Sequence, residues 1–170
     1  THSFGQGLTV TALQLARAYA ALMNGGMLVA PKLLVKKSTP ALRVFSPEAS
    51  DVVRDILYGV TESEHGTAPA ARIQGVRVSG KTGTAQKAAE GRRGYDPEAV
   101  LASFVGFVDT REIGAKRRLV MVVVVDEPNV RPRWGGTLAG PIFKRSIERI
   151  LSNLVTNEPN LRTHSPRKTI

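Results

Sequence analysis

Five consecutive positions of the chain hold a lysine, two threonines and two glycines, in the stretch SGKTGTAQK at residues 79–87. The stretch follows Val76-Arg77-Val78, whose alternation of apolar and polar residues predicts a β-strand. Glycine weakens the interior of a strand, and its presence there often marks the close approach of another backbone or of a ligand. A strand of this composition is suited to binding an acyl substrate along its length.

Each of the four central residues has a different part to offer such a substrate. Lys81 supplies a positive charge for a carboxylate, or for steering the proton of a neighbouring hydroxyl, and Thr82 supplies a hydroxyl to the same carboxylate. Gly83 has no Cβ, so a peptide-like substrate can lie alongside as an added antiparallel strand. The N–H of Thr84 can then serve as half of an oxyanion hole. A Lys-Thr-Gly triplet alone is a weak signal, and a purely structural strand is the alternative.

Helices are predicted on both sides of this strand in the chain. Thr11-Ala12-Leu13-Gln14 has the spacing of a capping box, and Asn24-Gly25-Gly26 is typical of a helix end. Ser46-Pro47 predicts the start of a second helix. Its expected apolar face consists of Ala49, Val52, Val53, Ile56, Leu57 and Val60. A last helix is expected over 140–155, with its apolar stripe at Phe143, Ile147, Ile150 and Leu154.

Further strands are predicted from short apolar runs. Short strands are expected at 33–35 and 42–45, and Gly66-Thr67-Ala68 is expected to begin a turn or short helix. After a long polar loop at 88–98, strands at 100–108 and 119–125 are expected to form an antiparallel hairpin. The second of them is apolar on both faces, which predicts a central strand covered on both sides. The predicted fold is therefore α/β in the loose, α+β sense: an antiparallel sheet flanked by helices.

Length and composition limit the classes of function. The 170 residues suit one domain, and the formal charge of +10 admits nucleic acid, an anionic membrane surface or anionic small substrates. The basic residues are scattered and are not interleaved with aromatics, so a nucleic-acid or lipid module is a remote alternative. The chain has no cysteine. No apolar run reaches the roughly 18 residues of a membrane span.

Other residues with chemical potential are expected to be structural. Asp126 and Glu127 are neighbours at the end of a predicted strand and should point to opposite faces, so they do not suggest a carboxylate pair. His2, His65 and His164 share no spacing, and no metal site is expected. Tyr19 is expected in the core. The residues Arg92, Arg93 and Tyr95 are expected in a solvated loop, with contact to a substrate or partner as the alternative.

Several longer stretches surround the triplet and carry a resemblance to a known family. They are SFGQGLTVTALQLARAYAALMNGG, GTAPAARIQGVRVSGKTGTAQK, ASFVGFV, VVVVDEP and WGGTLAGPIFK. In this order and spacing, the chain resembles the C-terminal half of the transpeptidase domain of class B penicillin-binding proteins, the septal cell-division type especially. The K-T-G triplet is the third signature motif of that family, after S-x-x-K and S-x-N. Domain 1–155 would be this part of the transpeptidase, and 156–170 a flexible basic tail.

The resemblance implies a D,D-transpeptidase whose serine attacks the D-Ala-D-Ala end of a peptidoglycan stem peptide and which β-lactams inhibit. It implies no cofactor. Lys81, Thr82 and Gly83 would be the third motif, and Thr84 would supply an oxyanion N–H. Substrate or β-lactam would also contact Ala85, Gln86, Trp134 and Gly135. The family is held at the bacterial inner membrane by an N-terminal helix and works on the periplasmic side, where division proteins are possible partners.

The chain departs from the family in one large respect. Both S-x-x-K and S-x-N lie upstream of the matched region, and no S-x-N occurs in the sequence. The single S-x-x-K, Ser165-Pro166-Arg167-Lys168, lies in the polar tail after the third motif. We expect the nucleophile half, including two strands of the family's five-stranded sheet, to be supplied elsewhere, as in a nicked or split protein. A β-lactamase or β-lactam sensor of the same fold is the alternative function.

A labelling experiment tests this expectation. The 170-residue chain by itself should take no covalent label from a fluorescent penicillin, because covalent turnover requires a nucleophile that the third motif cannot provide. Gel fluorescence after incubation measures the outcome. Labelling that disappears in a Ser165→Ala variant would instead identify the tail serine as a nucleophile.

Overall fold

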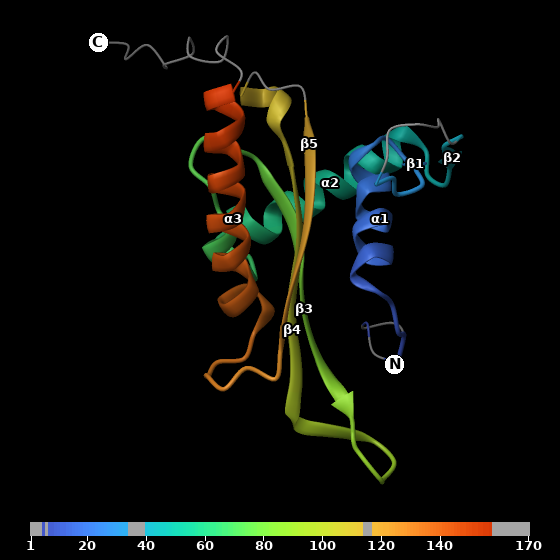
Figure 1. The fold of residues 1–170 in the computed structure, drawn as a ribbon, viewed down its shortest axis with the longest axis vertical. Helices are drawn as coiled ribbons and strands as arrows, with labels where there is room; N and C mark the ends of the chain where they lie inside the picture. The colour runs from blue at the N-terminus through green and yellow to red at the C-terminus, as the bar shows by residue number, and fades with distance from the viewer. Residues whose placement is uncertain (1–4, 6, 34–39, 114–116, 158–170) are drawn as a thin grey trace.

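The computed structural model describes residues 5, 7–33, 40–113 and 117–157 (Figure 1). Three helices, two 3-10 turns and five strands make up this part of the chain. In order they are α1 (Ala12–Met23), β1 (Met27–Leu28), β2 (Leu42–Arg43), α2 (Pro47–Glu62), η2 (Pro69–Ala71), β3 (Val78–Ala88), β4 (Tyr95–Asp109), η3 (Thr110–Ile113), β5 (Arg118–Asp126) and α3 (Gly135–Asn157). The prediction of helices with an antiparallel sheet is confirmed.

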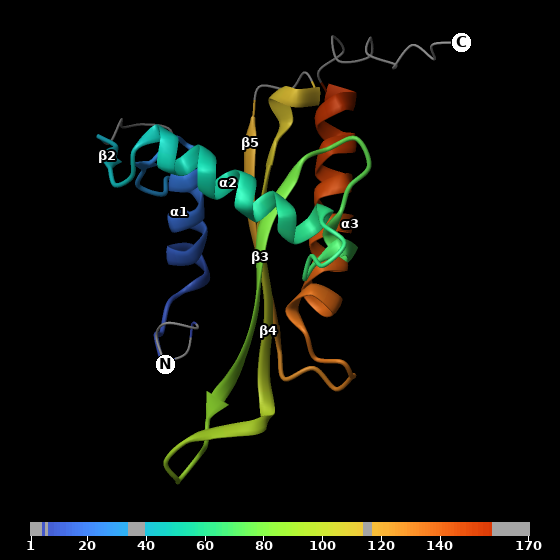
Figure 2. The same ribbon diagram turned by 180° about the vertical axis from the view of Figure 1, so that it is seen from behind.

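The main sheet has the order β3-β4-β5 and is antiparallel throughout. Its register pairs Gly83 with Ser103 and Thr82 with Phe104. Figure 1 shows this long, twisted sheet lying between α3 on one side and α1 on the other, and Figure 2 shows α2 crossing β3. The candidate strand β3 therefore has a strand partner on one edge only among the described residues.

Both early helices begin where the sequence places them. Thr11 caps α1 with a complete capping box: its hydroxyl accepts a hydrogen bond from the Gln14 N–H at 3.1 Å, while Gln14 Oε1 accepts one from the Thr11 N–H at 2.8 Å. Ser46 caps α2 in the same way, accepting from the Ala49 N–H at 3.1 Å, with Pro47 in the first helical position. These local signals satisfy backbone donors that would otherwise lack partners at a helix start.

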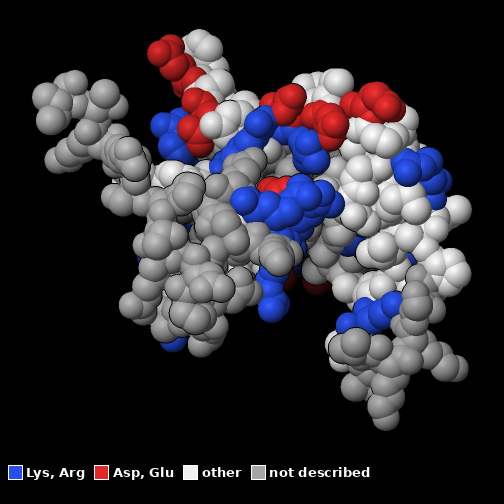
Figure 3. Space-filling model, turned by 90° about the horizontal axis from the view of Figure 1, so that it is seen from above, with Lys and Arg blue, Asp and Glu red and all other residues white. Residues whose placement is uncertain are grey.

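Charged side chains of both signs mix on the surface. Figure 3 shows acidic atoms among the basic ones on the end of the molecule seen from above. Arg54 pairs with Asp51 at 2.6 Å, Arg72 with Glu62 at 2.9 Å, and Arg77 with Asp55. Part of the positive charge on the described residues is therefore neutralised in exposed ion pairs, each of small energetic value.

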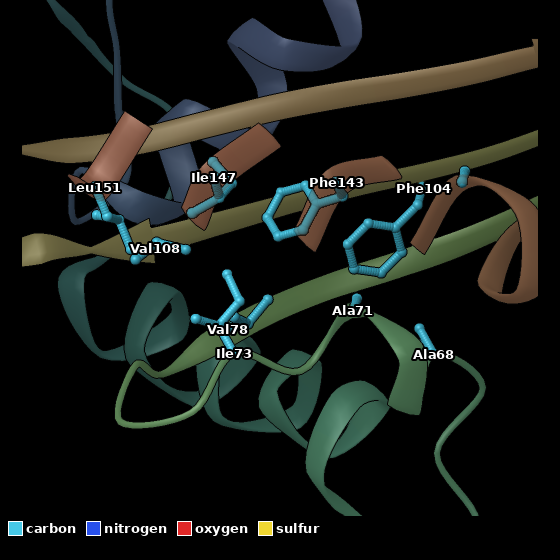
Figure 4. Close-up of a cluster of buried hydrophobic side chains, with 10 residues drawn as sticks. Ala68, Ala71, Ile73, Val78, Phe104, Val108, Phe143, Ile147 and Leu151 are labelled. Carbon is cyan, nitrogen blue, oxygen red and sulfur yellow. The ribbon is translucent and has the colours of Figure 1, made fainter. Parts of the chain in front are cut away.

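The larger core lies between α3 and the sheet, around two phenylalanines (Figure 4). The rings of Phe104 and Phe143 are both fully buried and meet edge to face, with centroids 5.0 Å apart. Gly80 and Gly106 provide the room for them. A Cβ on Gly80 would lie 2.4 Å from the Phe104 ring, and one on Gly106 would lie 2.7 Å from both rings. Gly80 in the candidate strand is thus explained by core packing.

Two sequence-based expectations about the sheet need correction. The strand predicted to be central, β5, lies at an edge of the described sheet, and β4 is central instead. The apolar character of β5 still has a reason, because α1 packs against one of its faces and α3 against the other. The polar stretch 88–98 is only partly a loop: β3 continues to Ala88 and β4 begins at Tyr95, so residues 89–94 connect the two strands of an extended hairpin.

The predictions for the last helix, for α2 and for the first short strand have different outcomes. The last helix starts at Gly135, earlier than predicted, and its Phe143 and Ile147 are buried as expected. The face of α2 is rotated relative to the prediction: Leu57 is buried with Ser50 and Thr61, while Val52 and Ile56 are 59% and 66% exposed. Residues 34–35 of the first predicted short strand lie outside the described residues, as does the tail at 158–170. Among the described residues, no helix has the length and apolar character needed to cross a membrane.

The edge-to-face pair gives a stability prediction. Phe143→Ala should lower the free energy of unfolding of the chain by about 3 to 5 kcal/mol, because it empties a fully buried ring position. Ile142→Ala, on the same helix but 39% exposed, should cost much less. Urea unfolding followed by circular dichroism measures both. Equal losses in the two variants would contradict the packing described here.

Candidate active-site wall

The outer edge of β3 exposes backbone groups at Thr82 and Thr84. The Val100 carbonyl accepts a hydrogen bond from the Glu127 N–H, so Val100 directs its backbone away from β3. Backbone direction alternates along an antiparallel strand. Ser103 therefore directs its backbone to Gly83, and the Thr82–Phe104 pair turns the backbone of Thr82 outward. The same alternation turns the N–H and carbonyl of Thr84 outward, which is the geometry required for adding a substrate strand.

Lys81 reaches this open edge from the other face of the strand. It pairs with Val105, on the face of the sheet that carries Phe107 and packs against α1 and α2. Its side chain is exposed and bends around the edge, so that Nζ donates to the Thr82 carbonyl at 3.0 Å. The ammonium and the outward backbone of Thr82 are thereby brought together, although neighbouring residues of a strand begin on opposite faces.

Two threonine hydroxyls face the other side, and each has a fixed partner. Thr82 Oγ1 lies 3.0 Å from Thr67 Oγ1, with either hydroxyl able to donate. Thr84 Oγ1 accepts a hydrogen bond from the Gly135 N–H, at the start of α3, at 3.2 Å. Both hydroxyls of the motif are therefore oriented by residues distant in sequence, Thr67 and Gly135.

The start of α3 packs directly on the backbone of the strand. A Cβ on Gly135 would lie 2.1 Å from the Ser103 carbonyl oxygen and 2.5 Å from that of Gly83. A Cβ on Gly136 would lie 1.9 Å from the Thr67 carbonyl oxygen. These contacts are with backbone atoms, which cannot rotate away. The two glycines are therefore what allows α3 to begin between β3 and the turn at Thr67.

A broad pocket of about 570 Å³ lies beside Thr84. Its lining consists of Thr84, Pro97, Val100, Arg131, Pro132, Arg133 and Trp134. The Trp134 side chain is 65% exposed, so its indole is available to a ligand. Further along β3, Ala85 is half-buried and Gln86 is exposed. The structure thus brings Trp134 and Gly135 close to Thr84.

The acidic pair and Tyr19 make contacts within the protein. Asp126 and Glu127 both pair with Lys87 Nζ at 2.7 Å, and these two carboxylates raise the pKa of the lysine. Tyr19 packs with the cluster of Met23, Leu57 and Phe107, and burial raises the pKa of its hydroxyl. The expectation that Asp126 and Glu127 point to opposite faces is wrong: β5 ends at Asp126 and Glu127 has a φ of 43°, so the alternation of a strand stops there and both carboxylates reach the same lysine.

No contact with the candidate wall, Lys81 to Gln86 with Trp134 and Gly135, is seen for the remaining candidates that the structure describes. Arg92 and Arg93 are exposed in the tight turn between β3 and β4, and Tyr95 is an exposed residue of β4 itself. His65 is exposed, and His2 and His164 lie outside the described residues. Within the described ranges, no three His, Asp or Glu side chains come close enough together to hold a metal ion.

Sequence reasoning missed Thr67, Ser103 and Glu98. Thr67 was expected only to open a turn, and its contact with Thr82 spans 15 positions of the chain. Ser103 crowds Gly83 from the next strand: a Cβ on Gly83 would lie 2.6 Å from its hydroxyl. Glu98 binds two arginines more than 30 positions away. No local pattern reveals such partners, since each depends on the register between strands.

Comparison with known proteins identifies the family. The model of the penicillin-binding protein transpeptidase domain matches residues 1–148. The chain belongs to this family. The chain is 38% identical over 146 residues to the probable peptidoglycan D,D-transpeptidase PenA of Neisseria meningitidis, a match that covers 85% of this chain and 24% of the relative. It therefore spans about a quarter of the length of that curated relative.

Solved structures agree with this assignment. The transpeptidase domain of penicillin-binding protein 3 from Burkholderia pseudomallei superposes with a TM-score of 0.75 at 40% identity, over 91% of this chain and 45% of that domain. Penicillin-binding protein 3 of Mycobacterium tuberculosis, in complex with aztreonam, gives a TM-score of 0.72 at 27% identity, over 88% of this chain and 36% of that one. The resemblance drawn from the sequence motifs is confirmed, and the transpeptidase fold with it.

The glycine contacts at the start of α3 give a testable prediction. Gly135→Ala should lower the free energy of unfolding by about 1 to 3 kcal/mol, because the helix must shift away from the Gly83 and Ser103 carbonyls. Gly140→Ala is the matched control on the same helix, since its Cβ would meet no atom closer than 3.5 Å. Urea unfolding compares the two. A Gly135→Ala chain as stable as the control would contradict the close contact.

Proposed function

We propose that this chain forms the K-T-G wall of the active site of a class B penicillin-binding protein that cross-links peptidoglycan stem peptides during septal cell-wall synthesis. The observation that carries the proposal is the outward-facing backbone of Thr84 on an open strand edge, with Lys81 and two oriented hydroxyls beside it. Family membership and the names of relatives such as PenA support it. The nucleophilic serine would come from sequence outside this chain.

In this proposal the serine hydroxyl attacks the carbonyl carbon between the two D-alanines. The C–N bond breaks, the terminal D-alanine leaves with the proton, and an acyl-enzyme ester forms. An amine of a neighbouring stem peptide then attacks the ester and regenerates the serine. The Thr84 N–H would stabilise the oxyanion in both steps, since a donor fixed in place lowers the barrier where negative charge develops.

The other residues of the wall would bind and orient the substrate. The stem peptide would lie along Gly83, Thr84, Ala85 and Gln86 as an added strand. Lys81 and the hydroxyl of Thr82 would hold the terminal carboxylate, with the Thr84 hydroxyl on the same face as that of Thr82. Trp134 and Gly135 would contact the side chain of the substrate. A β-lactam, with its carboxylate and strained amide, would occupy the same positions; relatives solved with aztreonam and with ampicillin support this.

The proposed setting follows the family. The whole protein would be held at the bacterial inner membrane by a segment outside this chain and would act on the periplasmic side. Its partners would include the stem peptide, β-lactams, the part of the protein that carries S-x-x-K and S-x-N, and cell-division proteins. Among the relatives, one is named FtsI and one stage V sporulation protein D. Residues 1–155 would belong to the transpeptidase domain, with 156–170 as a tail.

A β-lactamase or β-lactam sensor of the same fold is the alternative, and it is not favoured, because relatives are named peptidoglycan D,D-transpeptidases. A hydrolase must deacylate rapidly with a water, whereas a transpeptidase keeps a penicillin adduct for many minutes. Mass spectrometry of the adduct over time in the longer protein separates these classes. A nucleic-acid module is not favoured, because half of the described arginines are paired with acidic side chains.

Substitution of Lys81 tests the proposed role of the wall. In the protein that also carries the upstream motifs, Lys81→Ala should slow acylation by penicillin and by stem peptide about 10- to 100-fold, through loss of a charge-assisted contact worth roughly 1.5 to 3 kcal/mol. Lys87→Ala is the control on the same strand and face, with its ammonium turned to Asp126 and Glu127. Acylation of the Lys81→Ala protein at the wild-type rate would refute the assignment.

A further inference from the structure

We propose that Glu98 is a positioning residue: it holds the segment before α3 against β4 and thereby fixes Trp134 beside Thr84, so that the pocket selects apolar acyl side chains. The inference rests on the proposed function, because it concerns what enters the same site. The Glu98 carboxylate would influence which substrates bind without touching the bond that reacts.

A bulge in β4 places Glu98 close to Arg131 and Arg133. Gln86 pairs with Val100, yet the next residue of β3, Lys87, pairs with Asp96. Residues 97–99 therefore have no partner on β3 and bulge out of the ladder. Pro97 suits this place because it has no N–H to lose. Asp96 Oδ1 accepts a hydrogen bond from the Glu98 N–H at 2.9 Å, which fixes the backbone of the bulge.

Glu98 then holds two arginines of the segment before α3. Its Oε2 lies 2.7 Å from Arg131 Nη2 and 3.2 Å from Arg133 Nη1. Arg133 Nη1 also donates to the Glu98 carbonyl at 2.5 Å. The Arg133 side chain is 21% exposed, and its buried Nε has no hydrogen-bond partner. The contacts of its guanidinium with Glu98 are therefore what offsets the cost of placing Arg133 there.

Glu98, Arg131 and Arg133 together are called the clamp here. Trp134 lies between the clamp and the start of α3. Its carbonyl accepts hydrogen bonds from the Thr137 and Leu138 N–H groups, at 3.1 and 3.0 Å. The next residue, Gly135, is tied to Thr84. The backbone of Trp134 is thus fixed on its C-terminal side by the helix and on its N-terminal side by Glu98. Loss of the clamp would free only the second side, which moves the indole relative to Thr84 while leaving α3 in place.

The lining of the pocket indicates the class of group that it takes. Pro97, Val100, Pro132 and Trp134 are apolar, whereas the two arginines at the rim face the Glu98 carboxylate. The carboxylate neutralises positive charge beside these apolar surfaces and draws the guanidinium groups away from them. An apolar or aromatic acyl group therefore fits this pocket better than a small or strongly polar one.

The test compares two β-lactams in the protein that carries the upstream motifs. Benzylpenicillin carries an aromatic acyl group, and 6-aminopenicillanic acid is the same nucleus without one. In a Glu98→Ala variant, the ratio of acylation efficiencies for the two compounds should fall roughly three- to fivefold, as suits a largely exposed ion pair. Acylation by 6-aminopenicillanic acid should stay within about twofold of wild type, because Thr84 and Lys81 are unchanged. Glu127→Gln, an exposed ion-paired acid at the same end of the sheet, should leave the ratio unchanged.

The dependence of this ratio on salt distinguishes an electrostatic role of Glu98 from a merely structural one. Raising the ionic strength from about 0.05 M to 1 M should lower the ratio in the wild type, because salt screens exposed ion pairs, but not in Glu98→Ala. An unchanged ratio in Glu98→Ala, or an equal loss for both compounds, would overturn the inference while leaving the proposed function intact. A wild-type protein that neither compound acylates would refute the proposed function itself, and the inference with it.

Discussion

The contact between the first residues of α3 and the backbone of the sheet is the constraint on which the rest of the wall depends. Gly135 lies where any side chain would collide with the carbonyls of Gly83 and Ser103, and Gly136 lies equally close to Thr67. Through this one contact α3 is tied to β3, to β4 and to the turn before η2. The orientation of the Thr84 hydroxyl, the place of Trp134 and the contact of Thr67 with Thr82 all follow from it.

The glycines of the motif serve different purposes, although they are only three positions apart. Gly80 makes room for the Phe104 ring inside the core. Gly83 leaves space for the Ser103 hydroxyl, and its backbone lies against the start of α3, where Gly135 has no side chain either. The absence of side chains at both positions satisfies packing within the protein before any substrate is present. Packing inside the protein therefore already requires glycine at these positions. A ligand that approaches the backbone closely would benefit from the same absence of side chains.

Local sequence signals predicted most of the helices and strands. The order of the strands and the contacts between distant residues depend on long-range pairing, which these signals do not encode. The capping box at Thr11, the Ser46-Pro47 start and the stripe at Phe143 are encoded within a few residues, and the structure confirms them. The prediction that β5 is covered by helices on both faces holds, but among the described strands β5 lies at an edge, because such an apolar pattern is the same at an edge as in the middle. The motif itself was found from its residues and family likeness. The partners Thr67 and Glu98 were not, since their contacts arise from strand register and a bulge.

The hydrogen bond from the Gly135 N–H to Thr84 Oγ1 affects whether the Thr84 hydroxyl donates or accepts toward a ligand. A threonine hydroxyl has one proton to donate, and here its oxygen already accepts from the first N–H of a 23-residue helix. The partial positive charge at the helix start draws electron density toward that oxygen, which makes the remaining O–H a better donor. The fold therefore biases the Thr84 hydroxyl toward donating, so that a ligand at this end of the strand gains most from an acceptor atom.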